Sequence, residues 1–425
     1  MREPDVIASA LEGEYEERSA AGAVLHRGRC AVTLGADTLT IAASGRTLAV
    51  DLGEIDSVSP ADHKLSLAML DGSSLVLQRF GRPYDDLARS IVARWRDRLV
   101  KCLLLADLDE GDRYDAWAAL DGGPNEPSAA EVRLYESNLA VLPLGGGAFH
   151  WRLADIDSVE FDAARYVLEV ASGSRRLLLS KAGRRADELR AGIEEGRLAL
   201  EAKSAAALDR CFPFLGAARL ARLAAVMQEG RLVPLAALDQ IDRRLGSAVF
   251  GQPVDPNLRP YVAELRSRAE TRGVYVAFSM IRPDREAVED PPDTIAGEGY
   301  SDGDAGAGAT DIERETLFWF VFVLECRLEG LQAALAWEST SQGGRATYLF
   351  GVPSGRETPV GDAVRTIERG LSRLNRRRGP VYLADAVLDG DARFRHYRLA
   401  LRRVPEVRVL REAFLGRAVH SSVEG

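Results

Sequence analysis

The side chains best suited to acid–base chemistry or metal binding are scattered along this chain rather than grouped. No two of the five histidines have the spacing of metal ligands. The chain contains no H-E-x-x-H, no G-x-S-x-G and no G-x-x-x-x-G-K-[ST] motif. The sequence therefore predicts no catalytic residue, no metal ligand and no bound cofactor. The histidines are His26, His63, His150, His396 and His420.

The cysteines also lack a redox or zinc motif. Cys30, Cys102, Cys211 and Cys326 lie far apart, and no C-x-x-C pair occurs. Such cysteines in a long chain without an export signal are typical of reduced, buried thiols. Residues 1–20 have no apolar core of signal-peptide length, and no run approaches the roughly 20 apolar residues of a membrane-spanning helix. We therefore expect a cytoplasmic protein.

An acidic stretch at residues 283–312 is rich in Asp, Glu, Gly and Pro and has few large apolar side chains. Asp302, Asp304 and Glu313 stand at the first, third and twelfth positions of a calcium-binding loop. The sixth position, where such a loop needs glycine, is Ala307. We therefore predict a solvated, disordered insertion rather than a calcium site.

Two basic clusters are candidate anion-binding sites. The first surrounds a turn and a helix start, where backbone N–H groups also favour anions; its members are Arg175, Arg176, Lys181, Arg184 and Arg185. The second has arginines at helical spacing that could follow a phosphate backbone. It comprises Arg365, Arg369, Arg373, Arg376, Arg377 and Arg378, and Arg393, Arg395, Arg398, Arg402 and Arg403 follow it. A solvated face, or pairing of the second cluster with the acidic insertion, explains the same pattern.

The net charge of −9 disfavours a polyanion as the main partner. We therefore consider nucleic acid an unlikely partner, and we do not favour peripheral membrane contact.

The elements that position these residues follow from an internal repeat. LGEIDSV at 52–58 returns as LADIDSV at 153–159. The register continues to the following helices, where Leu87 aligns with Leu189 and Ile91 with Ile193. A repeat of about 100 residues is too long for a solenoid unit and indicates a duplicated domain.

Each copy has the pattern of several short antiparallel strands followed by one helix. In the first copy, Leu65, Leu67 and Met69 alternate as in a half-buried strand. The helix is expected at 83–102, where Leu87, Ile91, Trp95 and Leu99 form one apolar stripe.

This pattern resembles the pleckstrin-homology-like (PH-like) superfold, including its bacterial and GRAM-like members, over residues 21–204. Trp95 resembles the tryptophan common in that family's helix, whereas the second copy has Arg197 there. The resemblance implies a platform that binds proteins, peptides or occasionally lipid head groups. The family's usual head-group site needs basic residues between the first two strands, and only HRGR at 26–29 partly matches it.

The fold class predicted for the whole chain is a multidomain α+β protein with two repeated antiparallel β-domains, each closed by a C-terminal helix. The expected organisation is a tail at 1–20, repeats at 21–110 and 111–204, a helical bridge at 205–272, and a C-terminal α+β domain at 273–425. That last domain contains the strand 273–281, the acidic insertion and a helix at about 360–377.

The functional interpretation is a non-catalytic adaptor that binds another protein or a peptide through the tandem domains. One alternative is binding of an anionic ligand through an arginine-rich face. A second is an enzyme whose site lies in residues 273–425 without a recognisable motif. The sequence does not define the oligomeric state.

Overall fold

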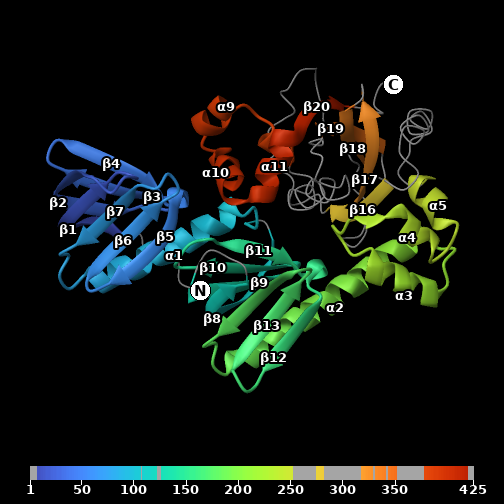
Figure 1. Ribbon diagram of the computed structural model, residues 1–425, viewed down its shortest axis with the longest axis horizontal. Coiled ribbons are helices and arrows are strands. Elements are labelled where there is room, and N and C mark those ends of the chain that lie inside the picture. The colour runs from blue at the N-terminus through green and yellow to red at the C-terminus, as the bar shows by residue number, and fades with distance from the viewer. Residues whose placement is uncertain are drawn as a thin grey trace, which may run out of the picture. The chain divides into compact units, whose positions relative to one another are not determined.

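The computed structural model describes residues 7–106, 108–121, 126–251, 274–281, 317–328, 331–340, 343–351 and 378–419 (Figure 1). The chain divides into two compact units. The first unit comprises Met1–Arg197 and Leu388–Val404, and the second comprises Leu198–Val387 and Pro405–Gly425. The acidic insertion at 283–312 and the helix expected at 360–377 lie outside the described residues.

The first unit contains two seven-stranded antiparallel sheets. The first sheet has the order β4-β3-β2-β1-β7-β6-β5. Its elements are β1 (Ile7–Arg18), β2 (Val24–Leu34), β3 (Thr38–Ala43), β4 (Arg46–Asp51), the 3₁₀ turn η1 (Leu52–Glu54), β5 (Ile55–Ala61), β6 (Lys64–Met69), β7 (Ser74–Gln78) and the helix α1 (Tyr84–Cys102).

The second sheet has the order β11-β10-β9-β8-β14-β13-β12, which repeats the order of the first. Its elements are β8 (Glu110–Leu120), β9 (Ser128–Tyr135), β10 (Asn138–Pro143), β11 (Phe149–Arg152), the 3₁₀ turn η2 (Leu153–Asp155), β12 (Ser158–Asp162), β13 (Val167–Ser172), β14 (Arg175–Ser180) and the helix α2 (Arg185–Cys211). The prediction of a mixed α+β chain with antiparallel sheets and helices is confirmed.

The apolar stripe of each following helix is buried. Leu87 and Ile91 of α1 are 2% and 0% exposed, and Leu189 and Ile193 of α2 are both 0% exposed. Trp95 is also fully buried, and its indole N–H donates to the carbonyl oxygen of Ile55 at 2.8 Å. These helices therefore form part of the hydrophobic core.

The N-terminal segment differs from the sequence-based expectation. Residues 1–20, expected to be a tail, contribute β1, which pairs with both β2 and β7. Among residues 10–18 of this strand, Tyr15 is the buried hydrophobic residue, and glutamates fill many of the other positions. Backbone hydrogen bonds hold the strand in the sheet and do not depend on side-chain type. The sequence of this strand has little apolar alternation, and local patterns therefore do not predict it.

Two further segments differ from the expected organisation. The helix α2 continues without a break through position 204, where the second repeat was expected to end. Residues 388–404, expected in the C-terminal domain, belong to the first unit together with the two sheets.

The second unit contains the sheet β15-β16-β17-β18-β19-β20, whose paired strands are antiparallel. Phe278, Trp337, Leu223 and Met227 are buried in its core with the end of α2. The strands are β15 (Val233–Pro234), β16 (Val274–Ile281), β17 (Leu317–Leu328), β18 (Leu331–Thr340), β19 (Gly343–Gly351) and β20 (Phe414–Val419). The helices of this unit are α3 (Ala217–Val226), α4 (Leu235–Asp239), α5 (Leu245–Gly251), α8 (Arg378–Val381) and α11 (Pro405–Ala413). The helix α9 (Asp385–Gly390) begins in this unit and ends in the first. Among the helices that the structure describes, none is long and apolar enough to cross a membrane.

Candidate functional site

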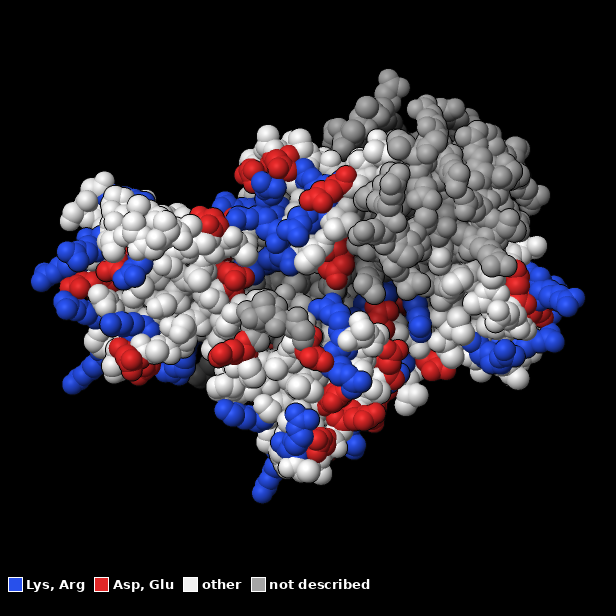
Figure 2. All heavy atoms as spheres, viewed as in Figure 1, with Lys and Arg blue, Asp and Glu red and all other residues white. Residues whose placement is uncertain are grey.

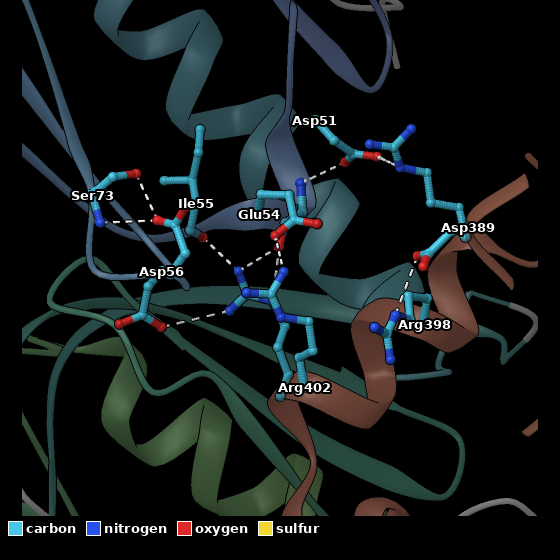
Figure 3. Close-up of polar contacts among 12 residues, drawn as sticks. Asp51, Glu54, Ile55, Asp56, Ser73, Asp389, Arg398 and Arg402 are labelled. Carbon is cyan, nitrogen blue, oxygen red and sulfur yellow. Dashed lines mark hydrogen bonds and ion pairs between the residues drawn. The ribbon is translucent and has the colours of Figure 1, made fainter. Parts of the chain in front are cut away.

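The helix α10 (Arg395–Arg403) lies against the turn η1 in the first unit, although about 350 residues separate the two in sequence (Figure 3). Tyr397, Leu399, Ala400 and Leu401 of this helix are buried. Three of its arginines contact the segment from Asp51 to Asp56. We call residues 51–56, which include η1 and contact α10, the docking turn.

Arg403 makes the most buried polar contact of the docking turn, with a side chain only 4% exposed. Its Nε and Nη2 donate to the carbonyl oxygen of Gly53 at 3.1 and 2.7 Å, and Nη2 also donates to that of Ile55 at 2.5 Å. Burial lowers the pKa of the Arg403 guanidinium, but arginine remains charged in proteins. The two carbonyl oxygens therefore solvate a buried cation, with Asp56 at 3.8 Å as the paired carboxylate.

Asp51 is the buried acid of the docking turn. It caps η1 by accepting from the N–H of Gly53 at 2.8 Å. Two nitrogens of Arg98 from α1 each donate to it at 3.0 Å, and Nε of Arg395 from α10 lies 2.9 Å away. One carboxylate thus joins the turn to two helices. A more exposed ion pair joins Arg402 to Glu54.

Gly53 provides the close approach between the turn and α10. A Cβ atom at this position would lie 2.4 Å from Cδ1 of Leu399, which is fully buried. It would also lie 3.0 Å from Sγ of Cys102 and 3.1 Å from Oδ1 of Asp51. Separations this short require neighbouring atoms to move, so glycine is needed for the observed packing.

The second sheet has the same turn but different residues at the two key positions. The N–H of Leu153 donates to Ser137 O at 2.8 Å, as that of Leu52 donates to Asp37 O at 2.9 Å. Ala154 stands where the first turn has Gly53, and Arg152 where it has Asp51. The turn η2 has no side-chain cap at Arg152.

A network of charged residues joins the two sheets within the first unit. Arg133 on β9 has a side chain only 3% exposed and pairs with Asp97 of α1 at 2.7 Å and with Glu131 at 2.6 Å. Arg96 of α1 pairs with Glu131 at 3.4 Å. The α1 helix of the first sheet is therefore tied to the second sheet by one largely buried ion pair, Arg96–Glu131, and by one in which the carboxylate of Asp97 is 46% exposed.

The first basic cluster is spread over β14 and the start of α2, and most of its members have partners within the chain. Arg176 pairs with Glu169, and Arg185 pairs with Glu188 at 3.0 Å. Lys181 Nζ lies 3.4 Å from the ring centroid of Trp117. Arg175 lies 5.6 Å from the ring centroid of Trp151, whereas Arg184 is exposed. The cluster does not converge on one point.

The second basic cluster lies mostly outside the described residues. The structure does not describe the positions of Arg365, Arg369, Arg373, Arg376 and Arg377. The arginines that follow in sequence are described, and those with the closest contacts to the docking turn are Arg395, Arg402 and Arg403. Arg393 and Arg398 pair locally with Asp391 and Asp389 at 2.6 and 3.2 Å.

Metal-ligating side chains and thiols are two kinds of chemically active group in the described part of the chain. It contains no group of three or more metal-ligating side chains that could hold an ion. Cys30, Cys102 and Cys211 are buried free thiols. Burial raises the pKa of Cys30 and Cys211 to about 11 and that of Cys102 to about 12, so these thiols are protonated at neutral pH.

Local sequence patterns did not identify the residues that form the contacts of the docking turn, namely Asp51, Gly53 and Arg98, or the contact that Arg403 makes with them. The only local signal was the glycine-to-alanine difference within the repeated heptapeptides. No protein family model matches the chain, and a search of curated proteins finds no similar sequence.

Proposed function

We propose that the protein is a non-catalytic adaptor that recognises protein segments through two PH-like domains. The identical strand order of the two sheets supports the PH-like assignment. The helix that follows each sheet, with the fully buried Trp95 on the first, supports it too. Fold alone does not define a ligand, so the proposed ligand class rests on the docking turn.

The observation that carries this proposal is the docking of α10 on the first sheet. A helix from a distant part of the chain is held there by buried hydrogen bonds, a buried carboxylate and a close apolar contact. This is the chemistry by which a domain recognises a protein helix. This contact supports the proposal, because the first sheet packs a helix from a distant part of the chain within its own unit.

The arrangement of charge favours a protein partner over an anionic ligand. On the face drawn in Figure 2, acidic and basic side chains are interspersed over the first unit. Most members of the first basic cluster are engaged by acids or aromatic rings of the chain itself. A phosphate would have to compete with these contacts.

The test is affinity purification of the full-length chain from its host, followed by reconstitution with purified components. We expect a protein partner that is recovered reproducibly after nuclease treatment and that binds the purified chain directly. Binding of nucleic acid at physiological salt would overturn the proposal. If six phosphates were contacted, such affinity would fall by roughly three decades between 50 and 200 mM salt.

A further inference from the structure

We propose that the docking turn is a selective receptor for a helix that carries arginines at positions i, i+7 and i+8 and a leucine at i+4. In this chain α10 is the ligand, with Arg395, Leu399, Arg402 and Arg403 at these positions. A partner protein that presents the same face competes with α10 for the turn. This inference rests on the proposed function and names its partner class.

The spacing of these four residues makes them neighbours on one face of a helix. Positions i, i+4, i+7 and i+8 lie within an arc of about 100° around a helix of 3.6 residues per turn. The contacts agree with this geometry, because Arg395 reaches Asp51, Arg402 reaches Glu54, and Arg403 reaches Gly53. The docking turn therefore contacts all three arginines from one side of the helix.

The last position requires arginine rather than lysine. The planar guanidinium presents several N–H groups in a fixed fork, and here Nε and Nη2 reach two different carbonyl oxygens. The ammonium of lysine is a more strongly hydrated point charge on a flexible stem. A lysine at Arg403 would retain the charge but lose this geometry.

The leucine position is selected by shape. The space above Gly53 is filled by Leu399, whose Cδ1 would lie 2.4 Å from any Cβ at that glycine. Leu399 and Cys102 are both fully buried, so a methyl group at residue 53 would require Leu399 to change its side-chain conformation within a packed core. The turn therefore accepts the leucine in its observed position because residue 53 has no side chain.

The second sheet excludes the same helix by shape and charge together. Ala154 carries a methyl group that would displace a leucine placed as Leu399 is on Gly53. Arg152 replaces the acid that would receive the first arginine, and it is engaged by Asp155 through two hydrogen bonds of 2.8 Å. The duplication thus yields one turn that binds this helix and one that does not.

The experiment uses a fluorescent peptide of residues 388–404 and the full-length chain, with binding followed by anisotropy. A variant carrying Arg402→Glu and Arg403→Ala releases the resident helix, and we expect it to bind the peptide roughly tenfold more tightly than the wild type. Adding Gly53→Ala to that variant should weaken binding by roughly tenfold. The matched control is Gly28→Ala, since nothing lies within 4 Å of a Cβ at Gly28.

Three outcomes overturn the inference. The first is a peptide affinity that Gly53→Ala does not change. The second is a peptide affinity that Arg403→Ala in the peptide does not change. The third is no peptide binding to the folded variant with Arg402→Glu and Arg403→Ala. If that variant does not fold, the milder Arg403→Lys variant takes its place. If a partner protein binds the chain but Gly53→Ala does not change the peptide affinity, this inference is wrong and the proposed adaptor function is not contradicted.

Discussion

Arg403 donates two hydrogen bonds to the carbonyl oxygen of Gly53, a residue 350 positions earlier in the chain. The guanidinium that does so is almost completely buried. A buried arginine normally pairs with a carboxylate, but here the carbonyl oxygens of Gly53 in η1 and of Ile55 at the start of β5 accept its hydrogen bonds. The turn thereby contacts Arg403 through its backbone, while the side chains of Asp51 and Glu54 pair with Arg395 and Arg402.

Removing the Arg403 side chain should destabilise the first unit. Arg403→Ala leaves the buried carbonyl oxygen of Gly53 without this donor, and an unsatisfied buried polar group costs about 1–3 kcal/mol. Urea unfolding of the full-length chain measures the loss. The control is Arg408→Ala on α11, because Arg408 is exposed. Equal stability of the two variants would contradict the contribution assigned to Arg403.

The equivalent leucines of α1 and α2 should respond alike to a buried charge. Leu87→Asp and Leu189→Asp each lose about 1.5–3 kcal/mol of apolar burial and also place a carboxylate in the core. We therefore expect each change to lower the free energy of unfolding by several kcal/mol. Leu198→Asp is the matched control, since Leu198 on α2 is 67% exposed. A mild effect at either buried leucine would show that the two helices do not fill equivalent core positions.

Asp242 in the second unit should contribute stability that is lost in acid. The Arg244 side chain, and then its backbone N–H, hold the pKa of the Asp242 carboxyl well below its usual range. A depressed pKa in the folded state means that the stabilisation is complete above the unfolded pKa, near pH 4, and is lost as the pH falls below it. Asp242→Asn should therefore lower the thermal stability at pH 7. The difference from the wild type should shrink between about pH 5 and pH 2. A difference that stayed constant over this range would rule out the charged carboxylate as its cause.

Cys102 should report whether α10 is docked. Its Sγ lies beside Gly53 and Leu399, the thiol is fully buried, and burial raises its pKa to about 12. We expect iodoacetamide at pH 8 to modify Cys102 very slowly in the wild type and faster in the Arg403→Ala variant. Peptide mapping by mass spectrometry distinguishes it from the other cysteines, and Cys30, buried in the first sheet, serves as the internal reference. Equal acceleration at Cys30 would indicate general unfolding instead of helix release.

Much of the fold could be predicted from local patterns. The four-residue stripe of Leu87, Ile91, Trp95 and Leu99 indicated the helix at 83–102, which the structure has at Tyr84–Cys102. The apolar run at 273–281 is the strand Val274–Ile281. Hydrophobic periodicity identifies such elements because they bury a side-chain face.

The rest depends on long-range relationships that local patterns do not contain. β1 has a weak apolar pattern and could not be predicted from it; backbone pairing with β2 and β7 holds this strand in place. The arginines of α10 looked like a solvated or phosphate-binding face, because their partners lie about 350 residues away. The two copies of the repeated heptapeptide differ at Gly53 and Ala154, but only the packing of Leu399 against Gly53 shows why this difference matters.

The most direct test of the docking account is amide hydrogen exchange of α10 in the full-length chain. The comparison is among the wild type, Gly53→Ala, Leu399→Ala and the double variant, with Gly28→Ala as control. We predict that Gly53→Ala speeds exchange of α10 by roughly tenfold or more in the wild-type background, which corresponds to about 1.4 kcal/mol. It should add little when Leu399 is already alanine, because the added methyl group then no longer meets the leucine. Unchanged protection of α10 in the Gly53→Ala protein would contradict the account.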